Sequence, residues 1–74
     1  MKTIDARNYE PKDKHIKIFE MYHSLEIGES MLLINDHDPK PLYYQFAFEQ
    51  TDKFKWTYQT SGPELFEVLI QKIA

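Results

Sequence analysis

The chain has 74 residues, a net charge of −3 and no cysteine. This length suits one domain, so we expect residues 1–74 to fold as a single unit. The charge and the lack of a basic run argue against nucleic acid as a partner, and the absence of thiols excludes disulfides and thiolate chemistry. No segment has the apolar length of a membrane span or the pattern of a signal peptide, so we expect a cytoplasmic protein that does not bind membranes.

The first elements in the chain are a short strand and a helix. Residues 2–6 alternate between polar and apolar side chains, which predicts a strand. From Asp13 or Lys14 to Glu26, apolar residues recur every three or four positions, which predicts an amphipathic helix. Asp13 is the expected N-cap, and Gly28 is expected to stop the helix.

A buried strand and a second helix follow. Residues 30–34 form an apolar run that is too short for a helix and predicts a strand. The segment from Asp38 to Pro41 contains two prolines, and a residue before proline is pushed away from helical geometry. The second helix is therefore expected to begin at about Pro41 and to end near Gln50.

The last third of the chain predicts a β-hairpin. Phe54, Trp56 and Tyr58 alternate with polar residues, and a turn at residues 61–63 separates them from a second alternating strand with Phe66, Val68 and Ile70. All six side chains are expected to face the helices.

The resulting order is β-α-β-α-β-β. Right-handed crossovers place both helices on one face, which predicts an α+β two-layer sandwich with a four-stranded mixed sheet. The uncovered face is expected to carry Met31, Leu33, Leu65 and Leu69 among polar residues. Such a patch favours a protein partner or weak homo-oligomerisation.

Three motifs carry a family resemblance. They are Ile4-Asp5-Ala6-Arg7, His15 early in the first helix, and Asn-Asp-His-Asp-Pro-Lys-Pro-Leu over residues 35–42. From end to end, the chain resembles the uncharacterised family called domain of unknown function 2249. The resemblance implies a fold but no activity.

The element order also resembles the SirA/TusA-like sulfur-carrier fold. Those carriers have a Cys-Pro-x-Pro motif at the start of the first helix, where this chain has Glu10 before Pro11. Since the chain has no cysteine, persulfide transfer is excluded.

Polar side chains are expected to converge at one edge of the sheet, where the carboxyl ends of the first two strands meet. The candidate ligand-binding residues are Glu10, His15, Asn35, Asp36, His37, Asp38 and Tyr44. Two imidazoles with nearby carboxylates suit a divalent transition metal held by His15 and His37. Two helix N-termini at the same edge suit an anion. In the structural alternative, Asp38 caps the second helix, His37 stiffens its loop and His15 packs at the edge of the core.

No complete catalytic motif is present, so the sequence does not predict an enzyme. We expect a small accessory domain that binds a metal ion, a small ligand or a redox partner at the His15/His37 edge. The alternative is a non-catalytic interaction module or homodimer that uses the open sheet face, with the loop around His37 purely structural. Tyr44 and Phe48 lie off the core stripe and suit a ligand pocket or an interface.

Overall fold

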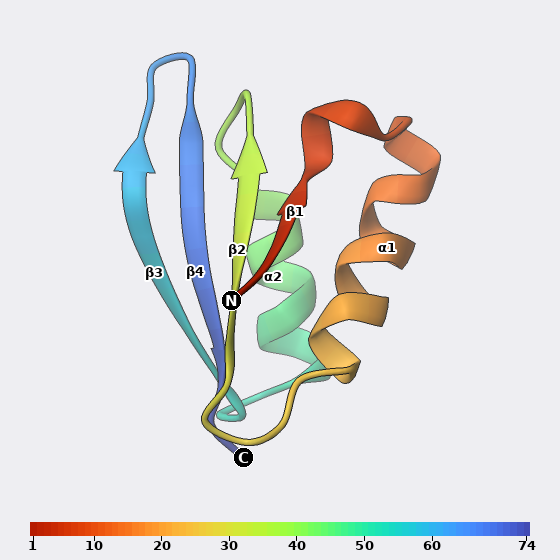
Figure 1. The fold of residues 1–74 in the computed structure, drawn as a ribbon, viewed down its shortest axis with the longest axis vertical. Helices are drawn as coiled ribbons and strands as arrows, with labels where there is room; N and C mark the ends of the chain where they lie inside the picture. The colour runs from red at the N-terminus through yellow and green to blue at the C-terminus, as the bar shows by residue number, and fades with distance from the viewer.

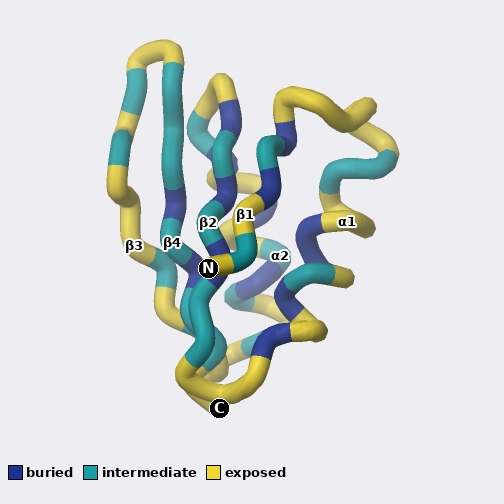
Figure 2. Tube along the Cα trace, in the orientation of Figure 1, coloured by how far each residue is buried: buried dark blue, intermediate teal, exposed yellow.

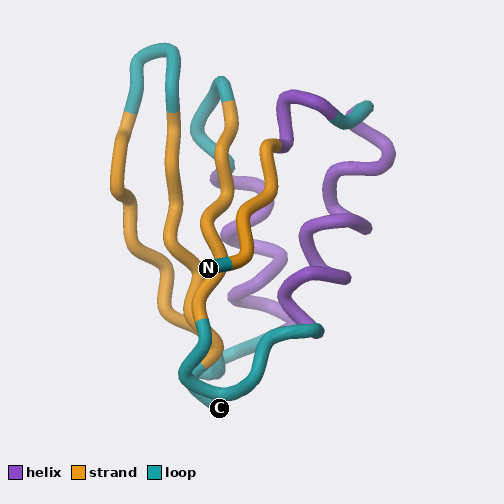
Figure 3. Tube along the Cα trace, viewed as in Figure 1, coloured by secondary structure: helices purple, strands orange, loops and turns teal.

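The computed structural model describes all 74 residues as two helices packed on one sheet (Figures 1 and 3). In chain order the elements are β1 (Lys2–Asp5), the short 3-10 helix η1 (Ala6–Asn8), α1 (Pro11–His23), β2 (Ser30–Asn35), α2 (Lys40–Glu49), β3 (Phe54–Ser61) and β4 (Phe66–Lys72). The expected order of strands and helices is confirmed, and η1 is the one element that the sequence did not predict.

The sheet is mixed, as expected, with the strand order β1-β2-β4-β3. β1 runs parallel to β2, whereas β4 runs antiparallel to both β2 and β3. Both helices lie on the same side of the sheet (Figure 1). The α+β two-layer architecture is therefore confirmed, and β1 and β3 form the two edges.

The first helix begins earlier than its apolar stripe suggested. α1 starts at Pro11 with Glu10 as N-cap, and Asp13 lies in the first turn. Proline has a fixed φ and no N–H to leave unpaired, so it suits the first helical position. The prediction of Asp13 as the cap was therefore wrong. The helix also ends at His23, where the Ser24 N–H bonds back to the carbonyls of Glu20 and Met21.

The core lies between the sheet and the helices (Figure 2). Phe46 of α2 is fully buried and stacks on Phe19 of α1 with ring centroids 4.3 Å apart. The Tyr22 ring packs nearly perpendicular to the Phe46 ring, with centroids 4.9 Å apart. Val68 and Ile70 of β4 are completely buried, and they pair in register with Tyr58 and Trp56 of β3, so this face of the hairpin points to the helices as expected.

The prediction of which β2 residues are uncovered was wrong. Met31 and Leu33 are fully buried, and they pair with Ile70 and Val68 on the helix-covered face. Leu32 and Ile34 occupy the open face instead. β2 has apolar residues at successive positions, so no alternation in its sequence fixed which side faces inward.

Leu65 also differs from its expected position. It lies in the connection between β3 and β4 rather than on the open face of a strand. The apolar centre of that face is therefore smaller than expected and consists of Leu32, Ile34 and Leu69, all of which are half-buried.

Candidate functional site

A small cavity opens at the sheet edge where β1 and β2 end. Asp5 at the end of β1 pairs with Ile34 near the end of β2, so η1, the start of α1 and the loop before α2 meet beside one another. The cavity has a volume of about 70 Å³ and is lined by Ala6, Lys14, His15, Ile18, Asn35, His37, Pro39, Pro41 and Leu42. His15 and His37 therefore line the same cavity from two different segments of the chain.

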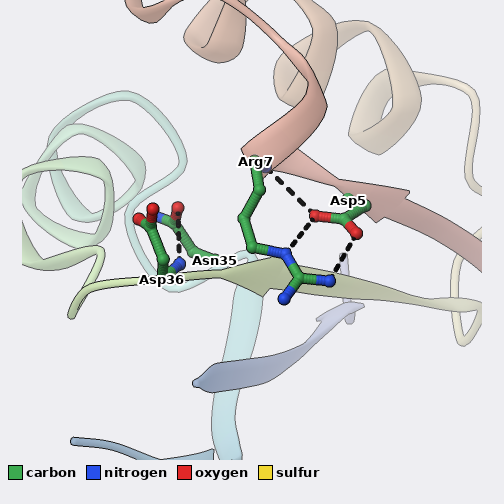
Figure 4. A network of polar contacts seen from close by, with 4 residues as sticks. All are labelled: Asp5, Arg7, Asn35 and Asp36. Carbon is green, nitrogen blue, oxygen red and sulfur yellow. Dashed lines mark hydrogen bonds and ion pairs between the residues drawn. The ribbon is translucent and has the colours of Figure 1, made fainter. Parts of the chain in front are cut away.

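Asn35 supplies a buried polar group to this cavity. Its side chain lies at the last residue of β2, and the residue is only 5% exposed. The side-chain oxygen accepts the Asp36 backbone N–H at 3.0 Å (Figure 4), which fixes the orientation of the amide. The Asn35 Nδ2 group donates to no protein atom, but it is not fully enclosed, since the only buried side-chain polar atom without a partner is Trp56 Nε1.

His15 is oriented by α2. Its Nδ1 lies 2.7 Å from Gln45 Oε1, and the Gln45 amide nitrogen donates to Glu49 Oε2 at 2.8 Å. Because the amide oxygen therefore faces the imidazole, Nδ1 carries the hydrogen and donates it. Nε2 remains free for a ligand. Gln45 was not anticipated, since nothing in its sequence context separates it from any other polar helix residue.

His37 is oriented in the same manner by its neighbour. Its Nδ1 donates to Asp36 Oδ1 at 2.7 Å, and both side chains are largely exposed. This hydrogen bond is the main reason that the pKa of the Asp36 carboxyl lies below its ordinary value. As with His15, only Nε2 remains unpaired. The Asp36 carboxylate is thus occupied in holding His37 and is not among the groups that line the cavity.

Asp38 anchors the loop rather than capping α2. It accepts the Tyr58 hydroxyl of β3 at 2.7 Å, whereas the N-cap position is occupied by Pro39 without a side-chain cap bond. The pKa of Tyr58 is raised, first by desolvation and then by this hydrogen bond. The nearby Trp56 Nε1–H is buried and has no hydrogen-bond partner. The interpretation of Asp38 as the helix cap was therefore wrong.

Two further candidates lie outside the cavity. Glu10 is exposed and pairs loosely with Lys12 at 3.8 Å. Tyr44 is 65% exposed on α2 and lines a separate pocket near β3. The structure thus brings His15, Asn35 and His37 to one cavity and leaves Glu10 and Tyr44 outside it.

Lys14 is the cavity residue that the sequence did not single out. It precedes His15 in the first turns of α1 and forms no ion pair. Its charge acts on Asp36, whose carboxyl pKa it helps to lower. No carboxylate is among the lining residues, so the only formal charge on the cavity wall is positive. Nor do three or more His, Cys, Asp or Glu side chains cluster anywhere in positions that suit a metal ion.

Asp5 and Arg7 stiffen the chain next to the cavity. Arg7 Nε and Nη2 donate to the two carboxylate oxygens of Asp5 at 2.9 and 2.7 Å (Figure 4). The Arg7 backbone N–H adds a third bond at 3.1 Å, which makes Asp5 the N-cap of η1. The hydrogen bond from the Arg7 side chain is the main reason that the pKa of Asp5 is lowered. This part of the motif therefore has a structural role.

The comparisons with known proteins identify a family and a similar fold. The model of a family described as "Uncharacterized conserved protein (DUF2249)" matches residues 3–72. The solution structure of HP1264 from Helicobacter pylori superimposes with a TM-score of 0.78 over 100% of both chains, at 13% sequence identity. No curated protein matches the chain. In addition, no helix has the length and apolar character needed to cross a membrane.

Proposed function

Because the chain belongs to the DUF2249 family of uncharacterized conserved proteins, whose description names no activity, we propose a function from the edge cavity alone: the protein binds a small oxyanion there. The observation that carries the proposal is the position of Asn35 Nδ2, a donor without a protein partner on the wall of a cavity whose only formal charge is that of Lys14. An oxyanion can accept this hydrogen bond, and a hydrogen bond to a charged acceptor is stronger than one to a neutral acceptor.

The size of the cavity limits the ligand. About 70 Å³ is well below the ~300–1,000 Å³ of pockets that hold drug-sized molecules. It suits an ion of a few heavy atoms, such as a carboxylate, nitrate or phosphate. An organic cofactor would have to extend outside the cavity.

The donors around the cavity match such an ion. Asn35 offers Nδ2–H, and the Lys14 ammonium supplies positive charge. His15 and His37 are held through Nδ1, so each imidazole adds an Nε2–H donor when it is protonated. Four groups from α1, the end of β2 and the following loop thus favour an oxygen-rich anion over a cation.

A transition metal held by His15 and His37 is the second candidate at this site. Both imidazoles are fixed through Nδ1 and present Nε2, which is the usual arrangement of metal-ligating histidines. The Lys14 charge and the lack of a lining carboxylate oppose it. The two candidates therefore make different demands on Lys14: its removal weakens an anion site and strengthens a metal site.

Thermal unfolding in the presence of added ions tests the proposal. Formate, nitrate or phosphate should raise the melting temperature in a saturable manner, because a ligand stabilises only the state that it binds. The shift should be lost in Lys14→Gln and His37→Ala and retained in His23→Ala, which changes an exposed histidine outside the cavity. His37→Ala should itself change stability by less than about 1 kcal/mol, since His37 is largely exposed.

The same experiment with zinc or nickel separates the candidates. A shift with metal alone, larger in Lys14→Gln and absent in His15→Ala, would replace the anion proposal with the metal site. No shift with any ion, together with a large stability loss in His37→Ala, would assign the loop a structural role.

A protein-interaction role is the third candidate, and it concerns another surface. Leu32 and Leu69 pair directly at the centre of the open sheet face, with Ile34 beside them and polar residues around them. The face suits weak self-association or a partner protein. Sedimentation of Leu69→Lys against the unmodified protein at high concentration tests this candidate, and identical monomeric behaviour would exclude homodimerisation by this face.

A further inference from the structure

A second pocket lies between α2 and the edge strand β3, and it shares no lining residue with the edge cavity. It has a volume of about 190 Å³ and is lined by Lys40, Tyr43, Tyr44, Trp56 and Tyr58. Four of the five side chains are aromatic, and Tyr44 and Tyr58 are substantially exposed. A contiguous group of exposed aromatic side chains marks a candidate site for a ligand or partner.

The rings are arranged as walls. Tyr43 and Tyr44 have centroids 5.6 Å apart with an interplanar angle of 69°. Tyr43 meets Trp56 at 5.3 Å and 73°, and Trp56 meets Tyr58 at 6.3 Å and 78°. Successive rings are therefore close to perpendicular. This arrangement does not clamp a flat ring between parallel faces, but it gives a pocket lining that changes direction from one ring to the next.

The electrostatics of these walls favour a cation. The face of an aromatic ring carries partial negative charge, and cages of Tyr and Trp bind quaternary ammonium groups. Tyr58 donates its hydroxyl hydrogen to Asp38 Oδ1 at 2.7 Å, which makes its ring more electron-rich. The Asp38 carboxylate also places a negative charge next to the Tyr58 hydroxyl.

The charge of Lys40 indicates that the ligand also carries an anionic group. Lys40 lines the same pocket, and its ammonium forms no ion pair with any carboxylate of the chain. It would repel a simple cation, but it would attract a ligand that carries an anionic group close to its ammonium. We propose that this pocket binds a zwitterionic quaternary ammonium compound, with the trimethylammonium group against the aromatic side chains and the carboxylate or phosphate on Lys40.

The size of the pocket agrees with such a head group. At about 190 Å³ it is larger than the edge cavity and smaller than the ~300–1,000 Å³ of a pocket for drug-sized molecules. The same chemistry occurs in free solutes such as glycine betaine and in phosphocholine lipid head groups. The experiment must therefore distinguish these two sources.

Trp56 makes the test direct, because it is the only tryptophan of the chain and lines the pocket. Titration with glycine betaine or phosphocholine should change its fluorescence and saturate. The neutral analogue of choline, 3,3-dimethylbutan-1-ol, has the same shape as choline without the charge. It should bind at least about fivefold more weakly than choline, the factor expected when a cation–π contact is lost. Equal binding of the neutral analogue, or no saturable change with either zwitterion, would overturn the proposal.

Matched variants locate the binding. Tyr44→Leu should weaken phosphocholine binding by about fivefold or more, whereas Phe48→Leu, on the same helix and 86% exposed, should not change it. Lys40→Gln should remove the preference for phosphocholine over choline. Unchanged binding in Tyr44→Leu, or an unchanged preference in Lys40→Gln, would contradict the assignment of the two half-sites.

Vesicles identify the source of the head group. Retention on phosphatidylcholine vesicles but not on phosphatidylglycerol vesicles would assign a lipid head group. Binding of the soluble zwitterions without retention on either would assign a free solute. Retention on both vesicle types with no response to the soluble zwitterions would refute the proposal, because binding would then not require the quaternary ammonium group.

Discussion

The Asp5 carboxylate accepts hydrogen bonds from both the backbone and the side chain of Arg7. It caps η1 by accepting the Arg7 backbone N–H, and it forms a bidentate ion pair with the Arg7 side chain. The two roles are separable, because asparagine keeps an oxygen for the cap and loses the charge. Since η1 forms one side of the edge cavity, the pair also controls how firmly that side is held.

Asp5→Ala should lower the free energy of unfolding by about 1 kcal/mol, the usual cost of a lost N-cap. Asp5→Asn should cost less, because the cap bond remains possible. Chemical denaturation at neutral pH measures both. Equal losses in the two variants would show that the charge, rather than the cap, is the stabilising feature.

The same pair predicts an acid dependence. Arg7 holds the pKa of Asp5 below its ordinary value of 3.8, so the ionised carboxylate stabilises the folded state above that pH. The stabilisation is lost as the pH falls through the lowered folded value. Asp5→Asn should therefore show a shallower loss of stability than the unmodified protein below about pH 4.

For individual residues, the sequence predicted part of the candidate site. The convergence of His15 and His37 on one edge followed from the parallel strands, and both residues line one cavity. The partners of the polar groups did not follow. Asp38 bonds to Tyr58, which is 20 residues away, and this contact depends on how β3 packs against the loop. Such tertiary contacts are not encoded in local sequence patterns.

Among the elements, α2 separates a buried side from an exposed one within a single turn. Phe46 is fully buried against Phe19 and Tyr22, whereas Phe48 is 86% exposed. The helical period places these two phenylalanines on different sides of α2. They therefore form a matched pair with the same chemistry in opposite environments.

Phe46→Ala should cost about 3–5 kcal/mol, because it removes a fully buried aromatic side chain. That is a large part of the total stability of so small a domain, so the variant should be largely unfolded. Phe48→Ala should change stability by less than about 0.5 kcal/mol. Circular dichroism melts compare the two, and a cooperative, little-changed melt for Phe46→Ala would contradict the described core.

The two glycines give a second matched pair. Gly28 and Gly62 have φ values of +92° and +81°, where other residues are strained. A Cβ at Gly62 would lie 2.8 Å from Cζ of Phe66, while a Cβ at Gly28 would meet no atom within 4 Å. Both alanine variants should lose about 1 kcal/mol or more from backbone strain. Gly62→Ala should lose more, and equal losses would show that Phe66 moves aside freely.

Element boundaries were predicted less well than element types. The start of α1 was placed too late because the apolar stripe begins after Pro11, although proline itself defines the first turn. The prediction assigned the buried and open faces of β2 the wrong way round, because Met31, Leu32, Leu33 and Ile34 are all apolar. Only pairing with β4 decides which of them are buried. A strand with apolar residues at every position has no alternation from which its buried face can be predicted.

The stability of the whole domain should depend on alkaline pH through two tyrosines. Burial raises the pKa of Tyr22, whose hydroxyl donates to the Lys53 carbonyl, and desolvation together with Asp38 raises that of Tyr58. The protonated phenols therefore stabilise the folded state below about pH 10, and this stabilisation is lost as the pH rises through the raised folded values.

The melting temperature should consequently fall as the pH rises above about 10. Tyr58→Phe should make that fall shallower, because phenylalanine has no proton to lose. Lysines also titrate in this range, so the comparison with the unmodified protein, rather than the slope itself, carries the conclusion. An identical pH dependence in Tyr58→Phe would remove Tyr58 as a contributor.

The position of β4 in the sheet has a consequence for the order of folding. β4 comes last among the elements, yet it lies between β2 and β3, which do not pair with each other (Figure 1). A chain that emerges from the ribosome can form the β1-α1-β2 unit early, but β3 has no partner until residues 66–72 appear. Sheet closure therefore waits for the final segment, and until then the edge of β2 and the apolar face of β3 are open to other chains.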